Sequence, residues 1–151
     1  MITKINIGMA LLAWGVTYFL NPTISNQYSQ KGYLPIKIQQ TPIQESIIRG
    51  KEIYADFCIQ CHLPSGKGNE ITFPPLDGSD WLKKKRKESI HAVKFGQKGE
   101  IIVNQKKYNS NMPPTGLSNQ EVADVMNYIM NSWSNSNKKM VTEKEVEQIK
   151  E

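Results

Sequence analysis

Two cysteines and a histidine stand within five consecutive residues, Cys58-Ile59-Gln60-Cys61-His62, and this motif constrains the chain more than any other feature. The C-x-x-C spacing closes one turn and presents both sulfurs to one edge of a porphyrin, so that two thioether bonds attach a haem. His62 is then placed beneath the ring, where it can ligate iron. These are the only cysteines in 151 residues, so one haem c bound through Cys58 and Cys61 uses both.

Two other interpretations of the motif are a thioredoxin-like redox pair and half of a zinc site. The zinc site needs two more ligands, and the only other histidine in the sequence is His91. The redox pair needs a strand-helix-strand context, which the surrounding sequence does not display. Haem attachment is therefore the interpretation that the motif favours.

Met112 lies in Asn111-Met112-Pro113-Pro114, within a stretch rich in Asn, Pro, Ser and Gly. This composition predicts a loop, which the two prolines stiffen. A thioether sulfur opposite a histidine nitrogen makes iron six-coordinate and raises its reduction potential. We therefore predict His62 and Met112 as the axial metal ligands. The alternative is a methionine that fills a packing gap, as we expect for Met126 and Met130 inside a helical pattern.

Further motifs follow in the order found in class I c-type cytochromes, and the chain resembles the monohaem domains that accompany bacterial respiratory and dehydrogenase enzymes. The resemblance covers residues 46–134 and rests on Gly50, Tyr54 and Cys58 at four-residue spacing, the segment 74–78, the axial loop 112–114, and Leu117, Ser118, Glu121, Tyr128, Ile129 and Trp133. One departure is Gln105, where relatives usually carry glycine after asparagine. This departure weakens the prediction of a tight turn there.

The resemblance implies a small all-α cytochrome c fold wrapped around one covalent haem. Its first and last helices should cross where Gly50 permits a close approach near Tyr128. It also implies that the Pro74 carbonyl accepts a hydrogen bond from the ring nitrogen of His62 that is not on iron, which makes Pro74 part of the cofactor site.

Capping patterns give the same helices independently of the resemblance. Thr41-Pro42-Ile43-Gln44 and Ser118-Asn119-Gln120-Glu121 are each typical of a helix start, and apolar residues follow both at helical spacing. A short helix is predicted over 84–94 and a brief strand over 101–103. Because a domain of this size has a marginal core, we expect apolar side chains to pack on the haem. Leu76, Trp81 and Val103 are the candidates, although Trp81 is equally suited to bind a haem propionate through its indole N–H.

Residues 5–20 form an apolar run without charge, preceded by Lys4. We expect an apolar helix over 1–20 that serves as a signal anchor, because no Ala-x-Ala cleavage pattern follows it; a removed signal peptide is the alternative. The haem domain is then membrane-anchored on the periplasmic side, or soluble in the periplasm after cleavage. Residues 21–45 are expected to form a polar tether and the start of the first helix, and 135–151 a charged tail helix.

The net charge is +5, and residues 83–87 are five consecutive cations. They are expected to form either a solvated helix face or a docking patch for an acidic redox partner. His91 is expected to be an exposed helix residue. We expect redox proteins as partners, contact with the membrane through residues 5–20, and no nucleic acid.

The sequence thus predicts an electron-transfer protein that shuttles one electron between respiratory partners outside the cytoplasm. With both axial positions of the iron filled, no place is left for a substrate, so the chain is not expected to be an enzyme or to have a catalytic residue. One alternative is a dedicated cytochrome subunit of a larger oxidoreductase. The other is a haem sensor or peroxidase in which Met112 is a labile ligand.

Overall fold

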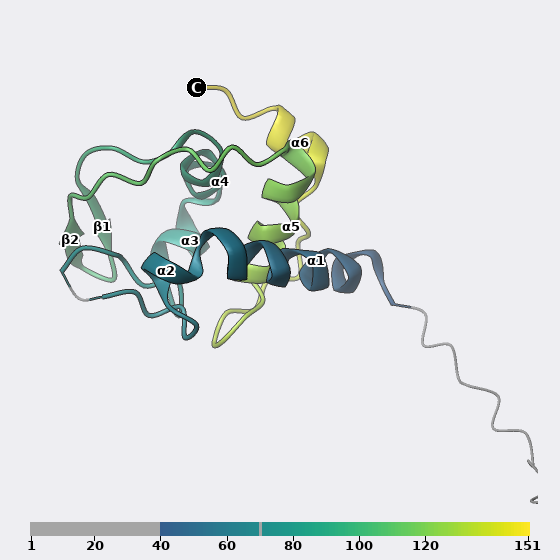
Figure 1. The fold of residues 1–151 in the computed structure, drawn as a ribbon, viewed down its shortest axis with the longest axis horizontal. Helices are drawn as coiled ribbons and strands as arrows, with labels where there is room; N and C mark the ends of the chain where they lie inside the picture. Colours follow the sequence, from purple (N-terminus) through teal and green to yellow (C-terminus); the bar gives the residue numbers. More distant parts are fainter. Residues whose placement is uncertain (1–39, 70) are drawn as a thin grey trace, which may run out of the picture. The chain divides into compact units, whose positions relative to one another are not determined.

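The computed structural model describes residues 40–69 and 71–151, and this part is mainly helical (Figure 1). The elements in chain order are α1 (Pro42–Phe57), α2 (Ile59–His62), α3 (Asp80–Lys84), α4 (Arg86–Phe95), β1 (Ile101–Val103), β2 (Lys106–Tyr108), α5 (Asn119–Ile129) and α6 (Glu143–Glu147). Within these ranges no helix has the length and hydrophobicity needed to cross a membrane. The apolar helix predicted over 1–20 and most of the predicted tether lie outside the described residues.

Helices α1 and α5 form the central pair of the fold, and both begin at the predicted caps. The Thr41 N–H donates to Gln44 Oε1 at 2.8 Å, and the Ser118 N–H donates to Glu121 Oε2 at 2.8 Å. The helices cross at Gly50, where an added Cβ would overlap the Asp124 carbonyl group and stand 2.9 Å from the Cβ of Tyr128. The predicted close approach near Gly50 is confirmed.

Polar side chains hold the two crossing helices together beside this contact. Asp124 is almost fully buried and accepts hydrogen bonds from Ser46 Oγ at 2.6 Å and from Arg49 Nε at 2.7 Å. Asn127 donates through Nδ2 to Ser46 Oγ at 2.8 Å. Because each buried acceptor has a donor, these bonds fix how α1 and α5 pack against each other, and the charge of Asp124 is compensated by Arg49.

The helix predicted over 84–94 is present as α4, and a further short helix that was not predicted, α3, precedes it. Helix α3 begins after Ser79, whose Oγ accepts a hydrogen bond from the Leu82 N–H at 3.3 Å. Lys85, at φ −121° and ψ 53°, leaves the helical region and separates α3 from α4. The basic run 83–87 is therefore divided between two helices and does not lie along a single helix face.

The strand predicted over 101–103 is β1, and it pairs antiparallel with β2. Asn104 and Gln105 have φ values of 49° and 65°, so a tight two-residue turn forms even though glycine is absent. The turn is tied to the start of α3, because the Asn104 N–H donates to Asp80 Oδ1 at 2.7 Å and the Asp80 N–H donates to Asn104 Oδ1 at 2.9 Å. This reciprocal pair supports the strained turn.

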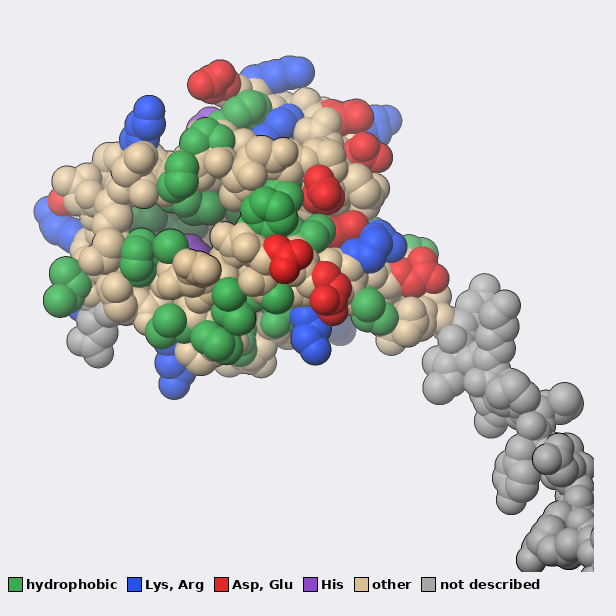
Figure 2. Space-filling view, viewed as in Figure 1, with side chains coloured by type: hydrophobic (Ala, Val, Ile, Leu, Met, Phe, Trp, Pro, Cys, Tyr) green, Lys and Arg blue, Asp and Glu red, His purple; other side chains and the backbone are tan. Residues whose placement is uncertain are grey.

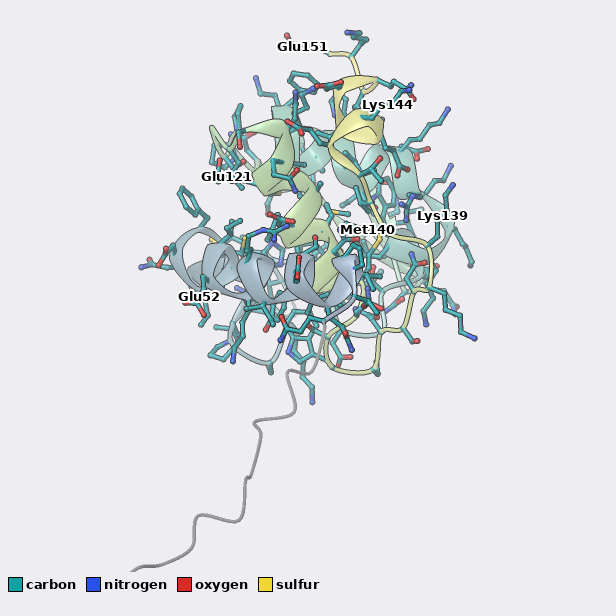
Figure 3. The ribbon with its side chains drawn as sticks, turned by 90° about the vertical axis from the view of Figure 1, so that its right-hand side faces the viewer. Glu52, Glu121, Lys139, Met140, Lys144 and Glu151 are labelled. Atoms are coloured by element: carbon teal, nitrogen blue, oxygen red, sulfur yellow. The ribbon has the colours of Figure 1, made fainter. Side chains whose placement is uncertain are left out.

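The C-terminal segment 138–151 packs on the helices of the domain. Figure 3 shows it running from Lys139 and Met140 beside α5 up to α6. Val141 and Val146 are fully buried. The Asn127 side chain binds the backbone of Val141 through two hydrogen bonds. Its Nδ2 donates to the Val141 carbonyl at 2.8 Å, and its Oδ1 accepts from the Val141 N–H at 2.7 Å. Within the predicted tail 135–151, the helix spans only Glu143–Glu147, and its apolar residue Val146 belongs to the core.

Candidate haem site

The end of α1 and the single turn of α2 place the two cysteines and the histidine on one cavity. Cys58 ends α1, and its carbonyl accepts from the Cys61 N–H at 3.2 Å and from the His62 N–H at 2.9 Å. Both thiols and the imidazole line the cavity. Cys58 is buried and Cys61 is exposed, so the thiol pair stands at the border between the cavity and the solvent.

The structure also bears on the alternative interpretations of the motif. Burial, together with the neighbouring Cys61, raises the pKa of the Cys58 thiol to about 11, whereas a redox-active thiol needs a lowered pKa. Among residues 40–69 and 71–151, no three His, Cys, Asp or Glu side chains lie together as a metal site. The geometry therefore favours neither a redox pair nor a zinc site.

The imidazole of His62 is oriented by the backbone of Pro74. His62 Nδ1 lies 3.1 Å from the Pro74 carbonyl oxygen. Because a carbonyl oxygen only accepts, Nδ1 carries the hydrogen and the lone pair of the ring is on Nε2. Burial lowers the pKa of His62 and outweighs the opposing effect of the hydrogen bond to Pro74. Burial thus favours the neutral ring, and Nε2 is the nitrogen available to a metal.

A tight loop brings Pro74 to this position, and Gly68 makes the loop possible. The Gly68 N–H donates to the His62 carbonyl at 3.0 Å, and the residue adopts φ 59°. An added Cβ would overlap the Phe73 carbonyl and stand 2.8 Å from the Pro74 oxygen. Gly68 thus protects the contact that orients His62. The sequence reasoning did not identify it, because a glycine in a polar loop has no distinctive pattern.

Met112 reaches the same cavity from a different part of the chain, the loop that follows β2. Its N–H donates to the Gln97 carbonyl at 2.9 Å, and its carbonyl accepts from the Gln97 N–H at 2.9 Å. Thr115 Oγ1 donates to the Val93 carbonyl at 2.9 Å. These hydrogen bonds attach the Met112 loop to the C-terminal end of α4. Gln97 and Thr115 were also missed, since no local motif indicates a bridge between separate segments.

Apolar side chains form the walls of the cavity, as expected for a bound porphyrin. Leu76, Trp81 and Val103, the three predicted wall residues, all line it. Further lining comes from Ala92 and Val93 of α4 and from Met126 and Ile129 of α5. Figure 2 shows hydrophobic side chains gathered in and around a hollow on one face of the domain. His91 lies outside this lining, with its ring centroid 5.2 Å from that of Phe95.

All five predicted site residues, Cys58, Cys61, His62, Pro74 and Met112, thus line one apolar cavity. The family model of cytochrome c matches residues 47–133. The chain belongs to the cytochrome c family. It is 34% identical over 110 residues to cytochrome c-552 of Thermus thermophilus, and this alignment covers 67% of the chain and 83% of that protein.

Cytochrome subunits of dehydrogenases are also similar to this cytochrome. The chain is 33% identical over 109 residues to the gluconate 2-dehydrogenase cytochrome c subunit of Pantoea cypripedii. It is 29% identical over 106 residues to the alcohol dehydrogenase (quinone), cytochrome c subunit of Gluconobacter oxydans (strain 621H). Each alignment covers 67% of this chain, but only 24% and 22% of those two proteins, so the likeness extends over about a quarter of each.

This cytochrome is an electron-transfer protein that binds one haem c covalently through Cys58 and Cys61. The residues present fit that group. Two thiols stand at one end of a cavity with apolar walls, and a neutral histidine has a free ring nitrogen beside them. When bound, haem supplies an iron that takes up and releases one electron. The chain's own contribution is to attach the haem, orient its ligands and exclude water.

Proposed function

We propose that this cytochrome carries electrons with its iron held between His62 Nε2 and Met112 Sδ. The observation that supports this most strongly is that the two side chains come from separate segments and line one cavity with both cysteines. His62 offers Nε2 because Nδ1 is engaged with Pro74. Met112 is held by both of its backbone hydrogen bonds to Gln97. Histidine and methionine together raise the reduction potential, which suits a carrier that accepts electrons from dehydrogenases.

With both axial positions filled, the chain itself has no open metal site for a substrate, so we propose that it catalyses no reaction. Its partners are redox proteins that give electrons to it and take electrons from it. The dehydrogenase subunits among its relatives support the alternative of a dedicated subunit of a larger oxidoreductase. Co-purification with an enzyme at a fixed ratio of cytochrome to enzyme would distinguish such a subunit from a free carrier.

We further propose that residues 5–20 anchor the protein to the membrane with the haem domain on the periplasmic side. Support comes from the uncharged apolar run and from the absence of a typical cleavage pattern after it. The mature protein should then stay with membranes in high salt, which releases only electrostatically held proteins. A mature N-terminus found by mass spectrometry between residues 20 and 40 would show instead that a signal peptide is removed.

The axial ligand is tested by replacing one cavity methionine at a time with leucine. Met112→Leu should abolish the weak far-red sulfur-to-iron absorption of the oxidised protein and should let carbon monoxide bind to the reduced protein. Met126→Leu is the matched control, because Met126 lines the same cavity from α5 and should leave both properties unchanged. If the far-red band survives Met112→Leu, Met112 is not the ligand. If the unaltered reduced protein binds carbon monoxide readily, a sensor or peroxidase becomes the better proposal.

A further inference from the structure

Arg86, the fourth cation of the basic run and the first residue of α4, is partly buried, and all of its N–H groups have acceptors. Its side chain is 18% exposed, and its Nε and Nη2 donate to the two carboxylate oxygens of Glu145 at 2.7 and 2.8 Å. The remaining N–H groups reach the Lys139 carbonyl at 3.3 Å, the Met140 carbonyl at 3.1 Å and the Met130 sulfur at 3.6 Å. This arrangement departs from the expectation of a solvated or docking run, because Arg86 faces the C-terminal segment.

The other end of α4 is tied to the same segment. Lys94 donates through Nζ to the Val146 carbonyl at 2.9 Å and to the Ile149 carbonyl at 3.3 Å, which are among the last carbonyls of the α6 region. Ile90 of α4 and Val146 of α6 are both fully buried and belong to the same core cluster. Helix α4 is thus joined to the segment 138–151 by a bidentate ion pair at its start and by an ammonium group at its end.

The end of α4 also carries the Met112 loop. Gly96 follows the helix at φ 88°, and an added Cβ there would stand 2.6 Å from the Met112 carbonyl oxygen. Gln97 makes both backbone hydrogen bonds to Met112, and Val93 accepts the hydroxyl of Thr115. A change in the position of α4 therefore moves the backbone of Met112 directly, because no other element lies between them.

We propose that Arg86 is a positioning residue for Met112: by fastening α4 to the C-terminal segment, it holds the sulfur in place at the iron. The inference rests on the proposed ligation by Met112. Arg86 does not touch the cavity, and it acts through α4 and Gln97. Breaking this partly buried, bidentate pair leaves Glu145 and two carbonyls without their donor, which destabilises the contact and lets the start of α4 loosen.

The experiment compares the oxidised haem-loaded protein with two variants that carry the same substitution. Arg86→Gln removes the pair at α4. Arg49→Gln removes the pair between Arg49 and Asp124, which also has a separation of 2.7 Å but joins α1 to α5. The probe is cyanide, which binds to the ferric iron only after methionine has left it. The rate of cyanide association, measured well below the unfolding temperature of each variant, therefore reports how often Met112 is released.

We expect Arg86→Gln to bind cyanide about ten times faster than the unaltered protein, a ratio equivalent to about 1.4 kcal/mol. Its far-red band should disappear on heating before the helix signal in circular dichroism does. Arg49→Gln should lower the unfolding temperature but keep the original cyanide rate. Equal cyanide rates for the two variants would overturn the proposal, because Arg86 would then contribute only general stability.

Two further results are informative. If Arg86→Gln does not fold or load haem, Glu145→Gln takes its place, because it keeps the side-chain shape and leaves Arg86 its carbonyl acceptors. We expect that variant to bind cyanide about three times faster, and an unchanged rate would overturn the proposal. If the unaltered protein lacks the far-red band, the ligation by Met112 fails and the positioning role fails with it. A band that is present while the variants behave alike refutes the positioning role alone.

Discussion

Replacing Gly50 by alanine tests how closely α1 and α5 must approach for the haem domain to fold. Alanine alone would favour the helix, by about 1 kcal/mol relative to glycine. The added Cβ, however, would stand 2.5 Å from the Asp124 carbonyl carbon and 2.9 Å from the Tyr128 Cβ, where ordinary contacts begin at 3.4 Å. The nearest of these atoms belong to the backbone of α5, which cannot rotate away as a flexible side chain can.

Helix α5 must therefore move away from α1 by about 1 Å, a gap that forfeits a quarter to a half of the dispersion attraction along the contact. The shift also stretches the hydrogen bonds of Asp124 to Ser46 and Arg49. Together these losses exceed the gain in helix propensity, and we expect the free energy of unfolding to fall by about 2–4 kcal/mol.

Guanidinium chloride unfolding of the haem-loaded protein, followed by circular dichroism, measures this loss. Lys51→Ala is the matched control, because Lys51 is the next residue of the same helix and is exposed. We expect that control to stay within about 0.5 kcal/mol of the unaltered protein. If Gly50→Ala were as stable as the unaltered protein, the helices would have room for a side chain and the close approach described above would be wrong.

Two further predictions concern the hairpin and the C-terminal ion pair. Gln105→Gly should raise the free energy of unfolding by about 1 kcal/mol, because glycine adopts φ 65° without strain; Asn104→Gly should gain less, since asparagine tolerates this region. The pKa of Glu145 is lowered by its hydrogen bonds to Arg86, so its contribution to stability is present above the unfolded pKa and is lost as pH falls through the folded pKa. Denaturant midpoints between pH 6 and acid pH should therefore fall less steeply for Glu145→Gln than for the unaltered protein, and parallel curves would contradict the pairing.

Features that depend on neighbouring residues were predictable from the sequence. The capping pairs at Thr41 and Ser118 are local, so the starts of α1 and α5 were placed correctly. The haem motif is confined to one turn, and Gly50 lies at a fixed helical spacing from Cys58. Such patterns predict the structure correctly because the residues that form each contact are neighbours in the sequence.

Features that depend on distant residues were not predictable in this way. The Gln97 bridge to Met112 joins two loops through backbone atoms, which carry no sequence signal. Arg86, which begins α4 directly after the break at Lys85, is bound to Glu145, and no local pattern indicates a partner so far along the chain. Tertiary contacts of this kind override a helical pattern that is uninterrupted in the sequence.

The basic run shows why a cluster of like charges in a sequence does not define a surface. Lys84 pairs with Asp80 at 3.3 Å and Lys85 with Glu88 at 3.6 Å, and both lysines are exposed, so a docking role for them stays a prediction. Arg86 differs because its acceptors lie 53 to 59 residues later in the chain, apart from the sulfur of Met130. The five cations thus include a structural residue that sequence alone cannot separate from its neighbours.

Arg86 lies outside the haem cavity, so the structure separates it from the residues that set the reduction potential. The reduction potential depends on the axial ligands, their hydrogen bonds and the burial of the haem, and Arg86 is not among the residues lining the cavity. Under the proposed ligation, the release of Met112 depends instead on how firmly α4 is held, and we infer that Arg86 and Lys94 hold it through their bonds to the C-terminal segment. Changes in the segment 138–151 should therefore alter the rate of ligand exchange much more than the potential. The proposal thus assigns the reduction potential to the residues that line the cavity and the retention of Met112 to residues outside it.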